Sequence, residues 1–237
     1  MRKQLLLTLA SILFISTGYA QWGKSIKGNG KIKTETRTTS NYDAVTCAGS
    51  MDFILVSGKE GDIKIKGDEN LLEYIVTEVK NNALIVKVKK GKSIYSKKGI
   101  VITIPFEDIN KVSLAGSGDL MNEDTITTRK FHVSLSGSGD IKLDVKTDAI
   151  ESAIAGSGDI TLEGLTNTLK VKVAGSGDFH GFDLQANDTE VSIAGSGDVK
   201  VVSNTNLKAS VVGSGDIVYK GSPKLDTKIT GSGSISN

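Results

Sequence analysis

The stretch Ile154-Ala155-Gly156-Ser157-Gly158-Asp159-Ile160 contains the unit that recurs along the second half of the chain. Its central tetrapeptide, Gly-Ser-Gly-Asp, occurs six times, and a seventh copy reads Gly-Ser-Gly-Ser. Successive copies lie 18 to 21 residues apart and begin at Gly116, Gly137, Gly156, Gly175, Gly195, Gly213 and Gly231. Self-similarity at about 20 residues is typical of a solenoid, in which one unit buries its apolar face only against its neighbours.

The residues around each copy predict short strands. An aliphatic residue stands two positions before every first glycine, and an apolar residue follows every fourth position, as Leu114 and Leu120 do in the first copy. The residue three positions before the glycine is small or polar. Apolar residues alternating with polar ones indicate a strand with one buried face. Each unit is therefore expected to form a strand, a corner, a second strand and a polar loop, which predicts an all-β parallel β-helix or solenoid of about 20 residues per coil.

The glycines have a mechanical role in this prediction. A sharp corner needs a residue with positive φ, and coils stacked about 4.8 Å apart leave little room for a Cβ. Weaker echoes of the pattern begin at Gly28 and Gly49, followed by a gap of 67 residues before Gly116. Counted from Gly28 to Ile235, the body is expected to hold about ten coils. Within the gap, Asp68 is expected to cap a helical turn over residues 69–74.

The N-terminus predicts export. Arg2 and Lys3 precede a short apolar run, and Gly18-Tyr19-Ala20 supplies small residues for cleavage. We therefore expect a signal peptide at 1–20 and a single β-solenoid domain at 21–237, irregular over about 40–110 and regular over about 111–237. Gln21, in place of a cysteine, argues against a lipid anchor there. The expected location is the periplasm, the outer-membrane surface or the medium.

Charge and cysteine content exclude some functions. The chain has 29 Lys+Arg and 27 Asp+Glu. Removing Arg2 and Lys3 leaves 27 of each, which argues against a nucleic-acid partner. The single cysteine, Cys47, excludes an intrachain disulfide and is expected to be a buried apolar residue. After the signal, no segment is long and apolar enough for a transmembrane helix. A local basic cluster is either a solvated loop or a site for an anionic glycan or lipid headgroup: Lys87, Lys89, Lys90, Lys92, Lys97 and Lys98.

The chain resembles a known family from about Tyr42 to Ser236. The resemblance rests on Tyr42-Asp43-Ala44-Val45, on Asp68-Glu69-Asn70-Leu71-Leu72, on Ile102-Thr103-Ile104-Pro105 and on the repeated Gly-Ser-Gly-Asp. These residues are similar to the putative auto-transporter adhesin head domain, also called the head GIN domain, of exported bacterial proteins. The resemblance implies a right-handed β-helix and export, and it implies adhesion. It supplies no catalytic motif.

The strongest candidate site is the column of aspartates that stacked corners would create. Its members are Asp119, Asp140, Asp159, Asp178, Asp198 and Asp216. Carboxylates about 5 Å apart repel one another by about 1 kcal/mol in water. Two explanations offset this repulsion: each Asp accepts backbone N–H bonds within its own turn, or the column binds a cation such as Ca²⁺. No other cofactor is expected.

Two further interpretations concern the rest of the surface. Position −1 before each corner is nearly always small, as at Ala155 and Ala174, which fits either close packing or docking of another subunit or an extended ligand. A polysaccharide-active enzyme would need a distinct carboxylate pair, whereas the Asp column is uniform and His132 and His180 lie at different repeat phases. We therefore expect a non-enzymatic, adhesin-like binding module, with a protein or glycan ligand and the option of a homo-oligomer. A calcium-binding solenoid is the first alternative and a polysaccharide-active enzyme the second.

Overall fold

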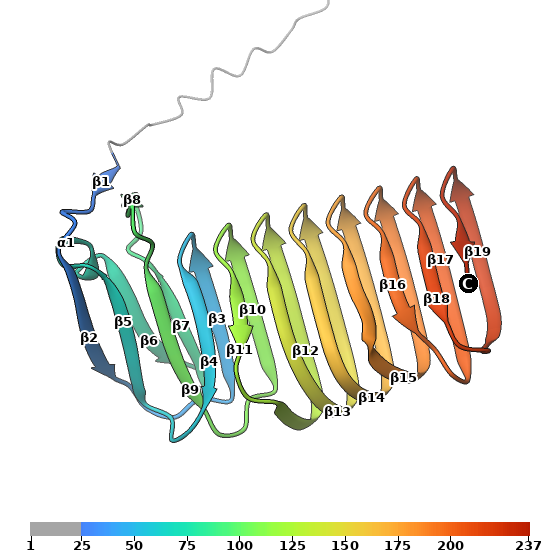
Figure 1. The fold of residues 1–237 in the computed structure, drawn as a ribbon, viewed down its shortest axis with the longest axis horizontal. Helices are drawn as coiled ribbons and strands as arrows, with labels where there is room; N and C mark the ends of the chain where they lie inside the picture. Colours follow the sequence, from blue (N-terminus) through green and yellow to red (C-terminus); the bar gives the residue numbers. More distant parts are fainter. Residues whose placement is uncertain (1–24) are drawn as a thin grey trace, which may run out of the picture.

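The structure is a computed structural model that describes residues 25–237, so the expected signal peptide at 1–20 lies outside the described residues. Strands stack side by side from a blue N-terminal end to a red C-terminal end (Figure 1). The regular part contains β10 (Lys111–Gly116), β11 (Leu120–Asn122), β12 (Ile126–Gly137), β13 (Ile141–Gly156), β14 (Ile160–Gly175), β15 (Phe179–Gly195), β16 (Val199–Val202), β17 (Asn206–Gly213), β18 (Ile217–Lys220), β19 (Lys224–Gly231) and β20 (Ile235–Ser236).

Every coil contributes one segment to each of two sheet layers. Segments that run into a Gly-Ser-Gly corner form layer A, and segments that leave the corner form layer B; β13, β14 and β15 run through both. All neighbouring coils pair in parallel, and the corner glycines align one above another, as in Gly137↔Gly156 and Gly156↔Gly175. Along β13 the buried positions change parity after Thr147, where the strand passes from layer B to layer A. The predicted all-β solenoid is confirmed.

The core lies between the two layers. Aliphatic side chains from both layers point inward and are almost completely buried, including the predicted residues Leu114, Leu120, Ile154 and Ile160. At roughly 1.5–3 kcal/mol for each buried large apolar side chain, these columns are the main source of stability. The alternation seen in the sequence is therefore the packing pattern of the core.

The part before Gly116 is built differently. It contains β1 (Ile26–Lys27), β2 (Ile32–Thr38), β3 (Ala44–Gly49), β4 (Asp52–Ser57), β5 (Asp62–Asp68), α1 (Glu69–Leu72), β6 (Ile75–Lys80), β7 (Ala83–Val88), β8 (Ile94–Tyr95) and β9 (Val101–Phe106). β3 and β4 form a coil that pairs with β10 and β11, and β7 and β9 form a coil on its other side. Beyond that coil the pairing becomes antiparallel, through β6 in layer A and β5 and β2 in layer B. The chain thus starts with β2 at the outer end of layer B and crosses to β3 and β4 inside the stack. It returns to the end through β5, α1 and β6, and comes back through β7 and β9.

This topology corrects the coil count. The body has about seven turns about 19 residues apart, not the ten expected. Gly49 pairs directly with Gly116, because the residues between them complete the Gly49 coil, form the coil beyond it and build the N-terminal end of the stack. The echo at Gly28 is not a coil, since the β1 strand beside it pairs only with β8 in a separate two-stranded sheet.

The cap expected at α1 is also different. The α1 helix is short, and its Leu71 and Leu72 are buried at the end of the core. The Asp68 side chain makes no capping hydrogen bond to the helix. Its Oδ1 instead accepts the N–H of Gly30 at 2.6 Å, and its Oδ2 accepts the hydroxyl of Ser96 at 2.5 Å. Asp68 therefore joins the N-terminal segment to the body, and these hydrogen bonds, led by that from Ser96, lower its pKa.

Candidate functional site

The predicted Asp column exists, and its carboxylates join neighbouring coils. Oδ1 of Asp159 accepts the backbone N–H of Asp178 at 2.8 Å, and Oδ1 of Asp178 accepts that of Asp198 at 2.8 Å. The same bond, between 2.7 and 3.5 Å long, connects every pair of coils from Asp52 to Ser234. The expectation that each Asp bonds within its own turn is therefore wrong, because the acceptor serves the next coil.

The backbone geometry of the corner explains why a carboxylate is needed. The carbonyl of Gly137 accepts two N–H groups from the next coil, those of Ser157 at 2.9 Å and Gly158 at 3.1 Å. The next N–H, that of Asp159, has turned away from this carbonyl and finds Oδ1 of Asp140 at 3.1 Å. A buried or shielded N–H without a partner costs about 1–3 kcal/mol. The side chain thus completes a ladder that the bent backbone interrupts.

The two glycines are both required by neighbouring backbone. A Cβ on Gly158 would lie 2.0 Å from the carbonyl oxygen of Gly139. The first glycine, Gly156, has a φ of 132°, a region that side chains rarely adopt. In both positions the obstructing atoms belong to the coil on the N-terminal side, so the predicted mechanical role of the glycines is confirmed.

The two irregular copies lie at the two ends of the column. Met51 replaces the second glycine in the first coil, where the side chain is buried and lies beside Ile94, Ser96 and Ile100 instead of another corner. Ser234 replaces the aspartate in the last described coil, and its hydroxyl donates to Oδ1 of Asp216 at 2.8 Å. Asp52, which was not among the predicted residues, heads the column; its place three after Gly49 was the available signal.

One position on the column brings three metal-ligating groups together. Ligand atoms of Asp159, Asp178 and His180 lie within 4.8 Å of one another, and His180 Nε2 is 3.9 Å from Asp159 Oδ2. His132 lies elsewhere, on layer A, so the two histidines are separate as expected. Oδ1 atoms along the column already accept N–H groups, which leaves the Oδ2 atoms for a cation. Hard Ca²⁺ prefers six to eight oxygens, so the column fits Ca²⁺ poorly, whereas the imidazole suits a metal such as Zn²⁺.

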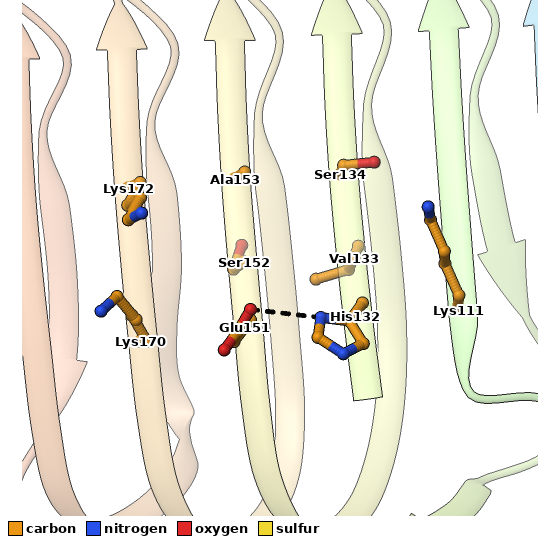
Figure 2. Close-up of a pocket in the computed structure, with 9 residues that line it drawn as sticks. All are labelled: Lys111, His132, Val133, Ser134, Glu151, Ser152, Ala153, Lys170 and Lys172. Carbon is orange, nitrogen blue, oxygen red and sulfur yellow. Dashed lines mark ion pairs between the residues drawn. The ribbon is translucent and has the colours of Figure 1, made fainter. Parts of the chain in front are cut away.

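The outer surface of layer A holds a second candidate site, a shallow groove of about 500 Å³ across β10, β12, β13 and β14. Figure 2 shows its side chains on neighbouring strands, with His132 Nδ1 paired to Glu151 Oε2 at 3.3 Å. Lys111, Lys170 and Lys172 also line it, so positive groups outnumber the one carboxylate.

The groove belongs to a larger pattern on layer A. Outward residues five positions before each corner form a charged column, whose members are Lys111, His132, Glu151, Lys170, Glu190, Lys208 and Asp226. Within it, Lys170 Nζ and Glu190 Oε2 are 3.2 Å apart. Beside this column lie the predicted small residues, including Ala155 and Ala174, which are exposed. The outer surface of layer A therefore carries small side chains next to the corners and charged side chains farther from them.

The other predicted groups have local roles. Lys87 pairs with Glu78 at 3.1 Å, and Lys89 and Lys92 lie over the Tyr74 ring. Lys98 donates to the carbonyl of Gly30 at 3.2 Å, so four of the six lysines of the basic cluster have partners within the N-terminal part. Hydrogen bonds from Lys80 and Lys87 lower the pKa of Glu78. Cys47 is completely buried, and burial raises the pKa of its thiol, as expected for a packing residue. Among residues 25–237, no helix is both long and apolar enough to cross a membrane.

Comparisons with known proteins agree with this architecture. A crystal structure of a putative adhesin from Bacteroides fragilis NCTC 9343 is 29% identical, with a TM-score of 0.82 over 90% of this chain and 100% of that one. A putative lipid binding protein from Parabacteroides distasonis ATCC 8503 is 30% identical, with a TM-score of 0.76 over 90% and 99%. A putative adhesin from the same strain is 25% identical, with a TM-score of 0.73 over 90% and 99%. No curated protein matches the chain.

The family model described as "Putative auto-transporter adhesin, head GIN domain" matches residues 41–223. That range spans most of the chain, including the Gly49 coil, the segment from β5 to β9 and nearly all of the regular stack. The resemblance inferred from the repeats is thereby confirmed, and the chain belongs to the head GIN domain family of putative auto-transporter adhesins.

Proposed function

We propose that the protein is an exported, non-enzymatic, adhesin-like module that binds an acidic glycan across layer A. The groove beside His132 is the observation that favours this function: it is open, it crosses four parallel strands, and three lysines face one glutamate in it. An extended anionic chain can contact successive coils at a repeat of about 4.8 Å. Export is supported by the expected signal peptide at 1–20, which leaves periplasm, outer-membrane surface and medium as destinations.

A lipid headgroup offers the same negative charge as an acidic glycan. The Parabacteroides distasonis neighbour has a lipid-binding name, and a phosphate would also suit Lys111 and Lys172. A glycan fits better because the groove is broad and shallow and its apolar lining is interrupted by charges, whereas acyl chains need enclosure by apolar walls. The test therefore compares binding to an acidic glycan with binding to anionic lipid.

Metal binding is the alternative function. The candidate metal site is limited to Asp159, Asp178 and His180 and no longer includes the whole column. The hydrogen bonds of the column favour a structural role for the aspartates at Asp119, Asp140, Asp159, Asp178, Asp198 and Asp216. A cation at the His180 position would use the remaining Oδ2 atoms and the imidazole. A polysaccharide-active enzyme has less support, because the column is uniform: each carboxylate uses Oδ1 in the same backbone hydrogen bond, and no one pair is set apart as an acid and a base.

The proposed function is tested by binding of the purified protein to immobilised polygalacturonate, with neutral dextran and anionic phospholipid vesicles as comparisons. We expect Lys111→Glu with Lys172→Glu to weaken polygalacturonate binding at least tenfold, because two attractive contacts become repulsive. The matched control, Lys142→Glu with Lys200→Glu, makes the same charge change on layer B and should leave binding unchanged. Equal losses in both variants, or binding only to vesicles, would contradict the glycan proposal.

The same preparations test the metal alternative. A ligand at 100 times its Kd adds about 2.7 kcal/mol, which would raise Tm by about 5–10 °C for a domain of this size. A rise with Zn²⁺ that His180→Ala removes and His132→Ala retains would favour the metal site. An unchanged Tm with Zn²⁺ and with Ca²⁺ leaves the aspartates as structural acceptors.

A further inference from the structure

The C-terminal end of the stack is an open sheet edge. Within residues 25–237, the last layer A strand, β19, pairs with β17 and has no partner strand on its other edge. Its inward residues Leu225 and Ile229 continue core columns, yet they are 47% and 46% exposed, while Leu207 and Val211 in the preceding coil are buried. An edge with unpaired backbone groups and exposed apolar residues is a template for another strand.

The sequence of β19 is complementary to itself when two copies run antiparallel. If Thr227 lies opposite Thr227 of a second copy, Leu225 lies opposite Ile229, and Asp226 lies opposite Lys228. Directly opposed residues in antiparallel strands point to the same face, so the apolar pair falls in the core layer and the charged pair falls outside. Opposite charges, apolar pairs and Thr–Thr pairs are all favourable cross-strand combinations.

This complementarity is specific to the exposed strand. The residues equivalent to Asp226 and Lys228 are Lys208 and Ser210 in β17, Glu190 and Ser192 in β15, Lys170 and Lys172 in β14, Glu151 and Ala153 in β13, His132 and Ser134 in β12, and Lys111 and Ser113 in β10. Only β19 has opposite charges at these two positions. Within residues 25–237, neither Asp226 nor Lys228 takes part in a salt bridge.

We propose that this edge is the interface of a homodimer, in which two copies pair tail to tail through antiparallel β19 strands. The two-fold axis then runs perpendicular to the sheets through Thr227, so layer A of one copy continues into layer A of the other. Both grooves face the same side, which gives a bivalent surface and a gain from avidity on a repetitive ligand. The end of one coil buries less than the roughly 1,600 Å² of a standard interface, so we expect a Kd that is roughly micromolar.

The test is sedimentation equilibrium of the full purified protein between about 1 and 500 µM, a range that brackets a micromolar Kd. Asp226→Lys and Lys228→Asp each place like charges opposite one another twice and should weaken dimerisation at least tenfold. The double variant Asp226→Lys/Lys228→Asp reverses both charges and should dimerise like the wild type. An equimolar mixture of the two single variants should form a heterodimer, because every opposed pair in it is again complementary.

Glu190→Lys is the matched control, since it makes the charge change of Asp226→Lys in the same column but inside the stack, and it should dimerise normally. Circular dichroism of each variant at low concentration checks that the monomer folds. A wild type that stays monomeric at the highest concentration overturns the proposal. A double variant that stays monomeric, or single variants that dimerise fully, also overturns it, because the charged pairs would then not lie opposite one another.

Discussion

The two ends of the stack differ in how they stop the repeat. At the N-terminal end the layers turn antiparallel through β2, β5 and β6, and α1 places Leu71 and Leu72 over the end of the core. At the C-terminal end of the described residues, the last strand of layer A, β19, is exposed along its whole length. A parallel repeat can propagate indefinitely, so termination needs residues outside the repeat. The N-terminal end has such a lobe, whereas within residues 25–237 the C-terminal end presents the edge strand β19.

The same contrast explains the two exceptions to Gly-Ser-Gly-Asp. A glycine is required where a coil lies on its N-terminal side, because its Cβ would point at that coil. An aspartate is required where a coil lies on its C-terminal side, because its carboxylate accepts that coil's N–H. Met51 stands where the neighbouring coil, formed by β7 and β9, has no corner of this kind, and Ser234 stands in the last described coil. The repeat is thus a directional joint, and its two exceptions lie at the two ends of the column of corners.

The largest effect is expected from a Cβ in the middle of the stack. Gly158→Ala would place its Cβ 2.0 Å from the Gly139 carbonyl oxygen, so the corner must shift and break the ladder on both sides. We expect a loss of about 3 kcal/mol and a fall in Tm of about 6–12 °C. Thermal unfolding followed by circular dichroism measures this directly.

The matched substitution at the open end is Gly233→Ala, whose Cβ meets the Gly215 carbonyl oxygen at 2.1 Å. The clash is nearly the same, but Gly233 lies in the last described coil, which can detach locally from the stack. The Tm should therefore fall much less, and only that coil should lose hydrogen-exchange protection. Equal falls in Tm for the two variants would show that the ends are as cooperative as the middle.

The second largest effect is expected from the hydrogen bonds that Arg37 makes within the N-terminal lobe. Arg37 on β2 donates to the carbonyl of Leu72 at 2.6 Å and to that of Ile75, which joins the outermost strand to the end of α1. Arg37→Ala removes both charge-assisted bonds and the 2.7 Å ion pair with Glu35, for a cost of about 2 kcal/mol. Arg37→Lys keeps the charge but reaches one carbonyl, so an intermediate Tm is expected. Urea unfolding of both variants measures these losses of stability. If Arg37→Ala left the stability unchanged, α1 would be held in place by the burial of Leu71 and Leu72 alone.

The sequence was sufficient for the parts of the fold that depend on the repeat itself. Alternation around Leu114 and Ile154 predicted the buried columns, and the spacing of the glycines predicted their alignment. The path between Gly49 and Gly116 could not be predicted, because β7 and β9 pair with β3 and β4 at long range and lack the corner motif. The Asp column was located correctly, but its bonding was assigned to the wrong coil: local turn chemistry is visible in one repeat, whereas an acceptor for the next coil appears only after stacking.

The smallest effect, and the sharpest test of the directional joint, comes from exchanging residues between the interior and the open end. Ser234→Asp gives the last coil a carboxylate that no described N–H can use, and it removes the 2.8 Å hydroxyl bond to Asp216, so stability should fall by less than about 1 kcal/mol. Asp198→Ser makes the reverse exchange inside the stack, where Oδ1 of Asp198 accepts the Asp216 N–H at 2.8 Å. That N–H loses its acceptor, and a cost of about 1–2 kcal/mol is expected. Asp198→Asn keeps an acceptor oxygen and should recover most of the loss. If urea unfolding showed that Ser234→Asp raises stability while Asp198→Ser lowers it, the aspartate would be a general preference of the corner and would not depend on a following coil.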